Sequence, residues 1–309
     1  MKAQKIVIGS RGSQLALWQA NWVKSQLERL HSNVEINIRV ITTSGDKIQD
    51  VPLAKIGGKG LFVKEIEEAL LVKEIDLAVH SMKDVPMELP AELVVSVITK
   101  REFPLDALIS KNGETLANLP QGATIGTSSL RRSSQLLKYR ADFDIRPLRG
   151  NVDTRLRKVK EGNYDAIILA SAGLNRLGWA SHITEEISDE VLLPAMGQGA
   201  LGIETRLDDA KTYDLVSALN HEQTNYAVTA ERSLVGRLDG GCQVPIGAYA
   251  KIVDNLITLK GLVASLNGEI IYRSENVGPV DDAINIGQAL GSKLLKMGAN
   301  EILEKLIKQ

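Results

Sequence analysis

The chain has 309 residues, 44% of them hydrophobic and 4% aromatic, with 37 basic against 38 acidic side chains and a formal net charge of -1. This length predicts two or three domains, and the balanced charge and scarce aromatic residues argue against a nucleic-acid-binding protein. The N-terminal apolar run is too short for a signal peptide, and no stretch approaches the ~18 apolar residues of a membrane span, so we expect a cytoplasmic protein or a mature chain without its targeting segment.

Strand-like and helix-like segments alternate through the first hundred residues. Apolar residues at helical spacing follow Ser13, and serine is a residue type that caps helix N-termini. In chain order we expect strands at residues 5–8, 36–40, 75–79 and 93–98, and helices that begin after Ser13 and at Phe62. This alternation predicts an α/β domain with a mainly parallel sheet.

A second unit of the same kind follows, and the last part of the chain differs from both. In the second unit we expect strands at 123–126, 143–148 and 166–169, and helices at 130–139 and 152–160. In the last part we expect a helix at 225–238, strands at 246–253, 256–264 and 270–275, and a long helix from about 281 to 306. That order predicts a small α+β domain with an antiparallel sheet.

The fold class that we predict is α/β with three domains. Two are periplasmic-binding-protein-like α/β lobes, and the third is the small α+β C-terminal domain. Candidate hinges at residues 99–101 and 194–200 indicate that the chain leaves the first lobe and later returns to it, as in two-lobed anion-binding proteins. The expected boundaries are 1–99 plus 200–219 for domain 1, 100–199 for domain 2 and 220–309 for domain 3.

Basic residues concentrate in three segments that are also rich in Gly, Ser and Thr, namely residues 9–13, 126–132 and 149–155. Each segment joins an expected strand to an expected helix, at the strand ends where ligands bind in open α/β sheets. Helix N-termini offer free N–H groups, and arginines bind carboxylates through paired hydrogen bonds. With Lys55, Lys59, Lys83 and Arg176, these turns predict a shared cleft for a ligand with many negative charges. The alternative for any single turn is a helix cap with a solvated charge.

Residues 55–60 superficially resemble a phosphate-binding loop, but they lack its spacing and follow no clear strand. A flexible loop that covers the cleft and a plain surface loop are equally open interpretations. The four histidines are dispersed and show no metal-ligand pattern, so we expect no metal site. They are His31, His80, His182 and His221.

Asp84 follows the expected strand 75–79, again at its carboxyl end. A carboxylate among many cations stays ionised, and it can then accept N–H groups or stabilise a cation. The alternative is a turn or N-cap aspartate.

Cys242 is the only cysteine, which rules out an intrachain disulfide and fits a reducing compartment. It follows two glycines in a loop between a helix and a strand, and glycines allow a backbone to approach a ligand closely. A lone cysteine is usually a small buried hydrophobe. The spacing leaves a thiolate nucleophile and a covalent attachment point both open.

The segments that contain these residues resemble the hydroxymethylbilane synthase family, also called the porphobilinogen deaminases. Residues 231–247 match the family's cofactor-attachment signature throughout. Five further segments match in the right order, at residues 52–62, 79–86, 126–132, 148–155 and 193–200. The resemblance covers essentially the whole chain and shows no departure at a motif position.

The resemblance implies that Cys242 carries a dipyrromethane cofactor through a thioether bond. Enzymes of this family are transferases that add four porphobilinogen molecules head to tail onto this primer, with loss of ammonia. Hydrolysis then releases linear 1-hydroxymethylbilane for tetrapyrrole and heme biosynthesis. The resemblance also suggests a monomer, and we expect neither a nucleic acid nor a membrane as a partner.

The resemblance implies that Asp84 is the catalytic carboxylate, which faces the pyrrole N–H groups and stabilises a cationic intermediate. Proton delivery to the leaving amine is a second possible role. The residues implied in binding cofactor and substrate carboxylates, directly or by neutral hydrogen bonds, are Arg11, Ser13, Lys83, Thr127, Ser129, Arg131, Arg132, Arg149, Gly150, Arg155, Arg176 and Gln198. Lys55 and Lys59 belong to the candidate cleft loop.

Two other classes of function are alternatives to this interpretation. Two α/β lobes with helix N-termini around a cleft also describe a non-catalytic anion-binding module, which needs neither the Gly-Gly-Cys loop nor a third domain. A nucleotide-dependent transferase is disfavoured by the absence of a phosphate-loop pattern. A covalent adduct on Cys242 would separate the synthase from both.

Overall fold

The computed structural model describes residues 4–47, 60, 62–239 and 244–307. The chain divides into two compact units. Unit 1 contains Met1–Arg101 and Ala200–Asn225, and unit 2 contains Glu102–Gly199 and Tyr226–Gln309. The chain therefore leaves unit 1 and returns to it. The three-domain boundaries stay a prediction.

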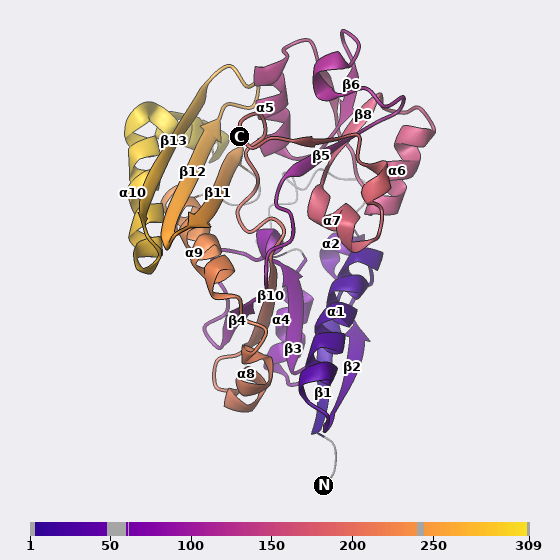
Figure 1. Cartoon of the computed structure of the whole chain (residues 1–309), viewed down its shortest axis with the longest axis vertical. Coiled ribbons are helices and arrows are strands. Elements are labelled where there is room, and N and C mark those ends of the chain that lie inside the picture. Colours follow the sequence, from indigo (N-terminus) through magenta and orange to yellow (C-terminus); the bar gives the residue numbers. More distant parts are fainter. Residues whose placement is uncertain (1–3, 48–59, 61, 240–243, 308–309) are drawn as a thin grey trace. The chain divides into compact units, whose positions relative to one another are not determined.

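Unit 1 is an α/β lobe built on a five-stranded sheet with the order β2-β1-β3-β10-β4 (Figure 1). Its strands are β1 (Gln4–Ser10), β2 (Val34–Val40), β3 (Leu77–Ser81), β4 (Leu93–Ile98) and β10 (Leu201–Arg206). Its helices are α1 (Gln14–Leu30), α2 (Ser44–Lys47), α4 (Lys64–Leu71), the short η1 (Met82–Asp84) and α8 (Ala210–Ser217).

Alternating side chains of the unit 1 strands form two cores, one on each face of the sheet. On one face Ile6 and Ile8 of β1 pack in a cluster with Val23 and Leu27 of α1 and with residues of α8. On the other face Val7 packs with Ile66 and Leu70 of α4. Helices therefore cover both faces, as the alternating pattern of the sequence predicts.

Unit 2 contains a second α/β sheet, with the order β7-β6-β8-β5-β9. Its strands are β5 (Asp106–Ser110), β6 (Thr124–Gly126), β7 (Asp144–Arg146), β8 (Ala166–Ala170) and β9 (Glu185–Ile187). Its helices are α5 (Leu130–Tyr139), α6 (Val152–Lys160), α7 (Ser171–Arg176) and the short η2 (Leu116–Asn118) and η3 (Ala180–His182). Ile168 packs toward α5, whereas Ile167 and Leu169 pack toward α6 and α7.

The C-terminal part of unit 2 is an antiparallel meander, β11-β12-β13, with helices against it (Figure 1). Its elements are α9 (Glu222–Arg237), β11 (Ile246–Val253), β12 (Leu256–Ala264), β13 (Ile271–Pro279), η4 (Val280–Asp282), α10 (Ala283–Leu294), the π-helical turn Leu295–Ala299 and α11 (Asn300–Ile307). The predicted architecture of two α/β lobes with a C-terminal antiparallel sheet is confirmed.

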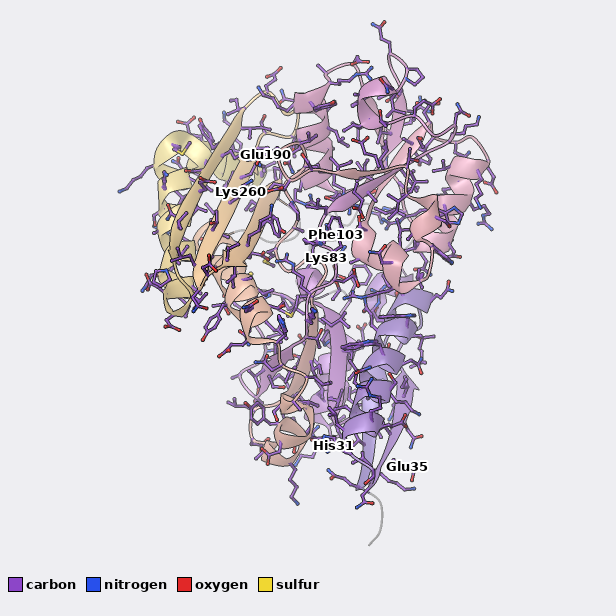
Figure 2. The ribbon with its side chains drawn as sticks, in the orientation of Figure 1. His31, Glu35, Lys83, Phe103, Glu190 and Lys260 are labelled. Atoms are coloured by element: carbon purple, nitrogen blue, oxygen red, sulfur yellow. The ribbon has the colours of Figure 1, made fainter. Side chains whose placement is uncertain are left out.

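Ion pairs join the segment after β9 to the C-terminal sheet within unit 2. Lys260 of β12 binds Asp189 at 2.8 Å and also contacts Glu190. Arg273 of β13 lies 3.3 Å from the Glu190 carboxylate. Figure 2 labels Glu190 and Lys260, which lie next to each other. Hydrogen bonds from Lys260 and its positive charge outweigh the effect of burial and hold the pKa of Asp189 below its ordinary value.

Both α/β sheets are mainly parallel, as the sequence predicts, because four of the five strands in each run in one direction. One strand in each runs the other way: β10 is antiparallel to β3 and β4, and β5 is antiparallel to β8 and β9. The sequence did not indicate β10 or β5 as strands, although both are completely buried. Each contains a charged residue whose partner is distant in the sequence: Asp106 of β5 pairs with two arginines, and Glu204 of β10 binds His80. Such residues interrupt the long apolar run or the alternation that marks a strand.

The predicted single helix over residues 281–306 is wrong. Gly298 has φ 116°, which breaks the helix between α10 and α11. A Cβ at this position would lie 2.5 Å from the Tyr272 hydroxyl, so a side chain meets both a backbone and a steric obstacle. A helical hydrophobic pattern continues through such a break, and for this reason the sequence did not reveal it.

A histidine and two glutamates lie close together beside the sheet of unit 1. His80 of β3 hydrogen-bonds Glu204 of β10 at 2.8 Å, and the two side chains are 5% and 1% exposed. Glu67 of α4 lies near them, and its Oε1 atom is buried without a hydrogen-bond partner among the described residues. Burial and the negative charge of Glu204 raise the pKa of Glu67 to about 6, despite the opposing effect of His80.

We expect Glu67→Gln to stabilise the protein at pH 7.5 but not at pH 4. Because the folded-state pKa of Glu67 lies above its ordinary value of 4.5, its stabilising contribution is complete below that value and is lost as pH rises through about 6. Partial exposure screens the effect, so we expect a gain of about 1 kcal/mol or less. Thermal unfolding at both pH values measures it.

Glu68→Gln is the matched control, since the Glu68 side chain is 61% exposed on the same helix. We expect no pH-dependent difference between this variant and the wild type. Equal behaviour of the two variants would contradict the assigned burial of charge at Glu67.

Candidate functional site

The first basic turn connects β1 to α1, and Ser13 caps the helix as predicted, because its hydroxyl accepts the Ala16 N–H at 3.3 Å. Arg11 lies in this turn and donates from Nε to both Asp46 oxygens, at 3.1 and 3.2 Å. Its guanidinium also lies 4.3 Å from the centre of the Phe62 ring. Arg11 is therefore held in a fixed orientation by a carboxylate and an aromatic ring.

Asp46 also accepts hydrogen bonds from the hydroxyl and backbone N–H of Thr43, at 2.8 and 3.3 Å. Burial alone would raise the pKa of Asp46, but the hydrogen bonds from Arg11 and Thr43 outweigh it and hold the pKa below its ordinary value. Asp46 is thus the ionised partner of Arg11 in unit 1. No local pattern in the sequence marks Asp46 as this partner.

Lys83 and Asp84 lie in η1, directly after β3. The backbone N–H of Met82 donates to Ala200 at 3.0 Å, and this bond fixes the start of η1 against the beginning of β10. The Asp84 side chain is exposed. It makes no hydrogen bond or ion pair with residues in the described ranges. Because β1 and β3 are parallel neighbours, Arg11 and Asp84 follow strands that end at the same edge of the sheet.

The second basic turn connects β6 to α5. Thr127 is buried, and its hydroxyl accepts the Ser129 N–H at 3.2 Å. Ser128 joins this turn to the next one, since its hydroxyl donates to the Leu148 carbonyl at 2.9 Å and accepts the Leu148 N–H at 3.0 Å. The sequence analysis assigned no role to Ser128.

The third basic turn connects β7 to α6. Gly150 has φ 107°, a conformation that side chains disfavour. Nε of Arg155 donates to the Gly150 carbonyl at 2.7 Å. The Arg149 guanidinium has no hydrogen bond or ion pair to any residue that the structure describes. The turn therefore presents a cation whose bonding groups are not used within this part of the chain.

Arg131 and Arg132 start α5 and meet one carboxylate, Asp106. Asp106 is the first residue of β5 and is fully buried. Its Oδ2 accepts a hydrogen bond from Nη1 of Arg131 at 2.7 Å, and its Oδ1 accepts one from Nη2 of Arg132 at 2.6 Å. Gln198 donates to the same Oδ1 at 3.0 Å. Three predicted binding residues therefore surround a carboxylate that the sequence analysis did not identify.

The charges of this cluster act on one another. Burial would raise the pKa of Asp106, but the two guanidinium groups hold that pKa far below its ordinary value. Burial lowers the pKa of Arg131, with Asp106 opposing the shift. The direction of β5 explains where Asp106 lies. Because β5 runs antiparallel to β8, its first residue pairs with Ala170 at the carboxyl end of β8.

Arg176 is bound to the segment that precedes β10, and Gln198 lies within that segment. Arg176 is buried and donates to the Gly199 carbonyl at 2.7 Å. Burial lowers the pKa of Arg176 to about 10, against the raising effect of Glu102. Glu231 of α9 is fully buried and accepts the N–H groups of Gly197 and Ala250, at 2.6 and 2.8 Å. Glu231 thereby fixes the backbone next to Gln198.

Comparison with protein families shows which family the chain belongs to. The family model described as "Porphobilinogen deaminase, dipyromethane cofactor binding domain" matches residues 6–214, and "Porphobilinogen deaminase, C-terminal domain" matches residues 225–296. The porphobilinogen deaminase of Geobacter sulfurreducens is 54% identical over 306 residues, covering 99% of this chain and 96% of the relative. That of Syntrophobacter fumaroxidans is 52% identical over 99% of both chains. The chain belongs to the porphobilinogen deaminase family.

Solved structures with a similar arrangement include two binding proteins. The probable amino-acid transporter binding protein ytmK from Bacillus subtilis is 14% identical over 71% of this chain and 90% of its own, with a TM-score of 0.43. The periplasmic aliphatic sulphonate binding protein SsuA from Escherichia coli is 17% identical over 76% of this chain and 70% of its own, with a TM-score of 0.41.

Within the two units, the predicted site residues of this porphobilinogen deaminase family member follow the ends of neighbouring strands. Unit 1 places Arg11, Ser13, Lys83 and Asp84 after β1 and β3. Unit 2 places the other predicted residues that the structure describes after β6, β7 and β8 or before β10, namely Thr127, Ser129, Arg131, Arg132, Arg149, Gly150, Arg155, Arg176 and Gln198. Cys242, Lys55 and Lys59 lie outside the described residues. The shared cleft stays a prediction.

The described residues contain no group of three or more His, Cys, Asp or Glu side chains that could hold a metal ion. No helix within those ranges has both the length and the apolar character needed to cross a membrane.

Proposed function

We propose that the chain is a hydroxymethylbilane synthase. It condenses four porphobilinogen molecules head to tail, with loss of ammonia, and releases linear 1-hydroxymethylbilane by hydrolysis. The observation that carries the proposal is the match to both family domains over residues 6–214 and 225–296. Each substrate pyrrole bears an acetate and a propionate, so the basic strand ends fit a growing polycarboxylate.

The cofactor of this family is a dipyrromethane. We propose that Cys242 attaches it through a thioether bond. When bound, it supplies a covalent primer whose free end accepts the first substrate molecule. The fit is supported by donors that no described residue uses: the Arg149 guanidinium, and Nε and Nη2 of Arg131. These groups suit carboxylates of a pyrrole chain.

The other proposed binding residues supply charge or neutral hydrogen bonds around the chain of pyrroles. In unit 1, Asp46 already holds the Arg11 side chain in one orientation. Binding a carboxylate at Nη1 of Arg11 therefore costs little further side-chain entropy. The remaining proposed binding residues are Ser13, Lys83, Thr127, Ser129, Gly150, Arg155, Arg176 and Gln198, and the predicted residue Arg132 adds its positive charge from within the fold. Lys55 and Lys59 are proposed as a loop that covers the bound chain.

Asp84 is proposed as the catalytic carboxylate. The C–N bond of the protonated aminomethyl group of the substrate breaks, ammonia leaves with the electron pair of that bond, and a cationic pyrrole remains. An ionised carboxylate close to the pyrrole N–H groups stabilises the cation as charge develops. The exposure of Asp84 and its lack of a partner among the described residues support this role over a structural one.

We propose a monomer in the cytoplasm, where a reducing environment keeps the single thiol available for the cofactor. Porphobilinogen is the substrate, and no nucleic acid or membrane takes part.

Incubation of the purified protein with porphobilinogen tests the function. We expect one ammonia released for each porphobilinogen consumed, and a linear tetrapyrrole as the product. Tight binding of porphobilinogen without consumption would instead indicate a binding protein.

A further inference from the structure

Asp106 is the only carboxylate that hydrogen-bonds Arg131 and Arg132 in the part of the chain that the structure describes. Both guanidinium groups are almost completely buried, with side-chain exposures of 6% and 8%, and Asp106 is at 0%. Buried cations without a counter-charge are strongly destabilising. One carboxylate therefore makes it possible to keep two arginines under the surface, and a net positive charge remains.

The two arginines use Asp106 differently. Arg132 commits all three of its nitrogens: Nε and Nη2 donate to Asp106 at 3.1 and 2.6 Å, and Nη1 donates to the Ile168 carbonyl at 3.0 Å. Its Nε/Nη2 edge, which would bind a ligand carboxylate side-on, is occupied by Asp106, so a ligand could bind side-on there only by displacing that carboxylate.

Arg131 commits only one nitrogen. Nη1 donates to Asp106 and to the Leu193 carbonyl, both at 2.7 Å. Two acceptors on one nitrogen fix the plane of the guanidinium, because the group is rigid and planar. Its Nε and Nη2 form the edge that binds a carboxylate side-on, and this edge makes no hydrogen bond to any residue within 4–47, 60, 62–239 and 244–307.

We propose that Asp106 is a positioning residue that divides the two arginines between different tasks. It holds Arg132 as an internal cation of the fold, and it directs the Nε/Nη2 edge of Arg131 toward a carboxylate of the bound pyrrole chain. The inference rests on the proposed function for the identity of that carboxylate. The division itself follows from the hydrogen bonds and changes the expectation that both arginines bind ligand.

The pair of substitutions Arg131→Gln and Arg132→Gln tests the division. We expect Arg131→Gln to melt within a few degrees of the wild type and to show about a 10- to 100-fold higher KM for porphobilinogen or a lower dipyrromethane occupancy by intact mass. We expect Arg132→Gln to lower Tm by roughly 5–15 °C, because it removes the paired hydrogen bonds to Asp106 and the bond to the Ile168 carbonyl, whereas Arg131→Gln removes a single hydrogen bond to Asp106. A stable Arg132→Gln with the same binding defect as Arg131→Gln would overturn the proposal.

Asp106→Asn tests the positioning role with little change of shape. We expect both a lower Tm and the binding defect of Arg131→Gln, and combining the two substitutions should add little further to KM. Wild-type Tm and KM in Asp106→Asn would overturn the role. If Asp106→Asn does not fold, the comparison of Arg131→Gln with Arg132→Gln still tests the proposal.

Asp142→Asn is the matched control, because Asp142 pairs with Arg140 at the surface of the same lobe. We expect wild-type Tm and KM, as an exposed ion pair contributes little. The melting temperatures do not depend on activity, so they test the division even if the wild type fails to consume porphobilinogen, whereas that failure alone would refute the proposed function.

Discussion

Asp84→Ala is expected to fold normally and to lose at least about 10²-fold in kcat for porphobilinogen consumption. Asp84 is exposed at the end of β3 and has no partner in the described ranges, so its removal breaks no internal contact there. The carboxylate is assigned to the cation that forms when ammonia leaves, and losing a preorganised electrostatic group of this kind costs about 10²–10³-fold in rate or more. Steady-state kinetics on protein with a verified Tm measures the loss.

Two further variants separate charge from position at this site. Asp84→Asn keeps the shape and removes the charge, so we expect a loss close to that of Asp84→Ala. Glu88→Ala removes an exposed carboxylate four residues later, and we expect activity near that of the wild type. Near-normal turnover by Asp84→Ala would refute the proposed role, and an equal loss in Glu88→Ala would show that the effect is not specific to Asp84.

Cys242→Ser is expected to abolish both cofactor attachment and turnover. A thiolate forms near neutral pH, whereas a serine hydroxyl does not ionise there, so the variant lacks the nucleophile that would bind the primer. Without a covalent primer the first condensation has no acceptor. We expect a loss of more than about 10³-fold in product formation, together with a mass that lacks the adduct.

The single cysteine makes this prediction unusually direct to measure. A thiol assay on denatured holoprotein should find almost no free thiol, because the only sulfur is in a thioether bond. The same assay on protein produced without tetrapyrrole precursors should find one thiol per chain. A free thiol in fully active protein would exclude Cys242 as the attachment point.

Local signals in the sequence predicted much of the fold. The helices Leu130–Tyr139 and Val152–Lys160 have the predicted bounds, and Ser13 is an N-cap as expected. These features depend on neighbouring residues, namely a polar cap and apolar positions at helical spacing. The three strand-to-helix turns are confirmed for the same reason.

The antiparallel strands could not be predicted in this way. In β10 the buried residues include Glu204, which binds His80 through one oxygen, and Arg206, which donates to backbone carbonyls of residues 70 and 75. Polar residues in a buried strand mask its pattern, because their partners are distant in sequence. The break at Gly298 has a similar cause, since the side chain that fills the space beside it belongs to Tyr272 of β13, which is distant in the sequence.

In the candidate site, too, features that depend on neighbouring residues could be predicted and contacts between distant residues could not. Clustering of arginines at strand ends could be read directly from the sequence. Their internal partners could not, because Asp46 and Asp106 lie about 35 and 25 residues away along the chain. Asp106 also lies at the start of its strand, and it reaches the basic edge only because β5 is antiparallel.

Intact-mass spectrometry of rapidly quenched protein tests the central claim most directly. The wild-type chain should carry a dipyrromethane adduct, and brief exposure to porphobilinogen should add a ladder of up to four pyrrole units to that mass. Cys242→Ser should show neither the adduct nor the ladder. An unmodified wild-type chain that still converts porphobilinogen, or an identical ladder in Cys242→Ser, would contradict growth of the product on an anchor at Cys242.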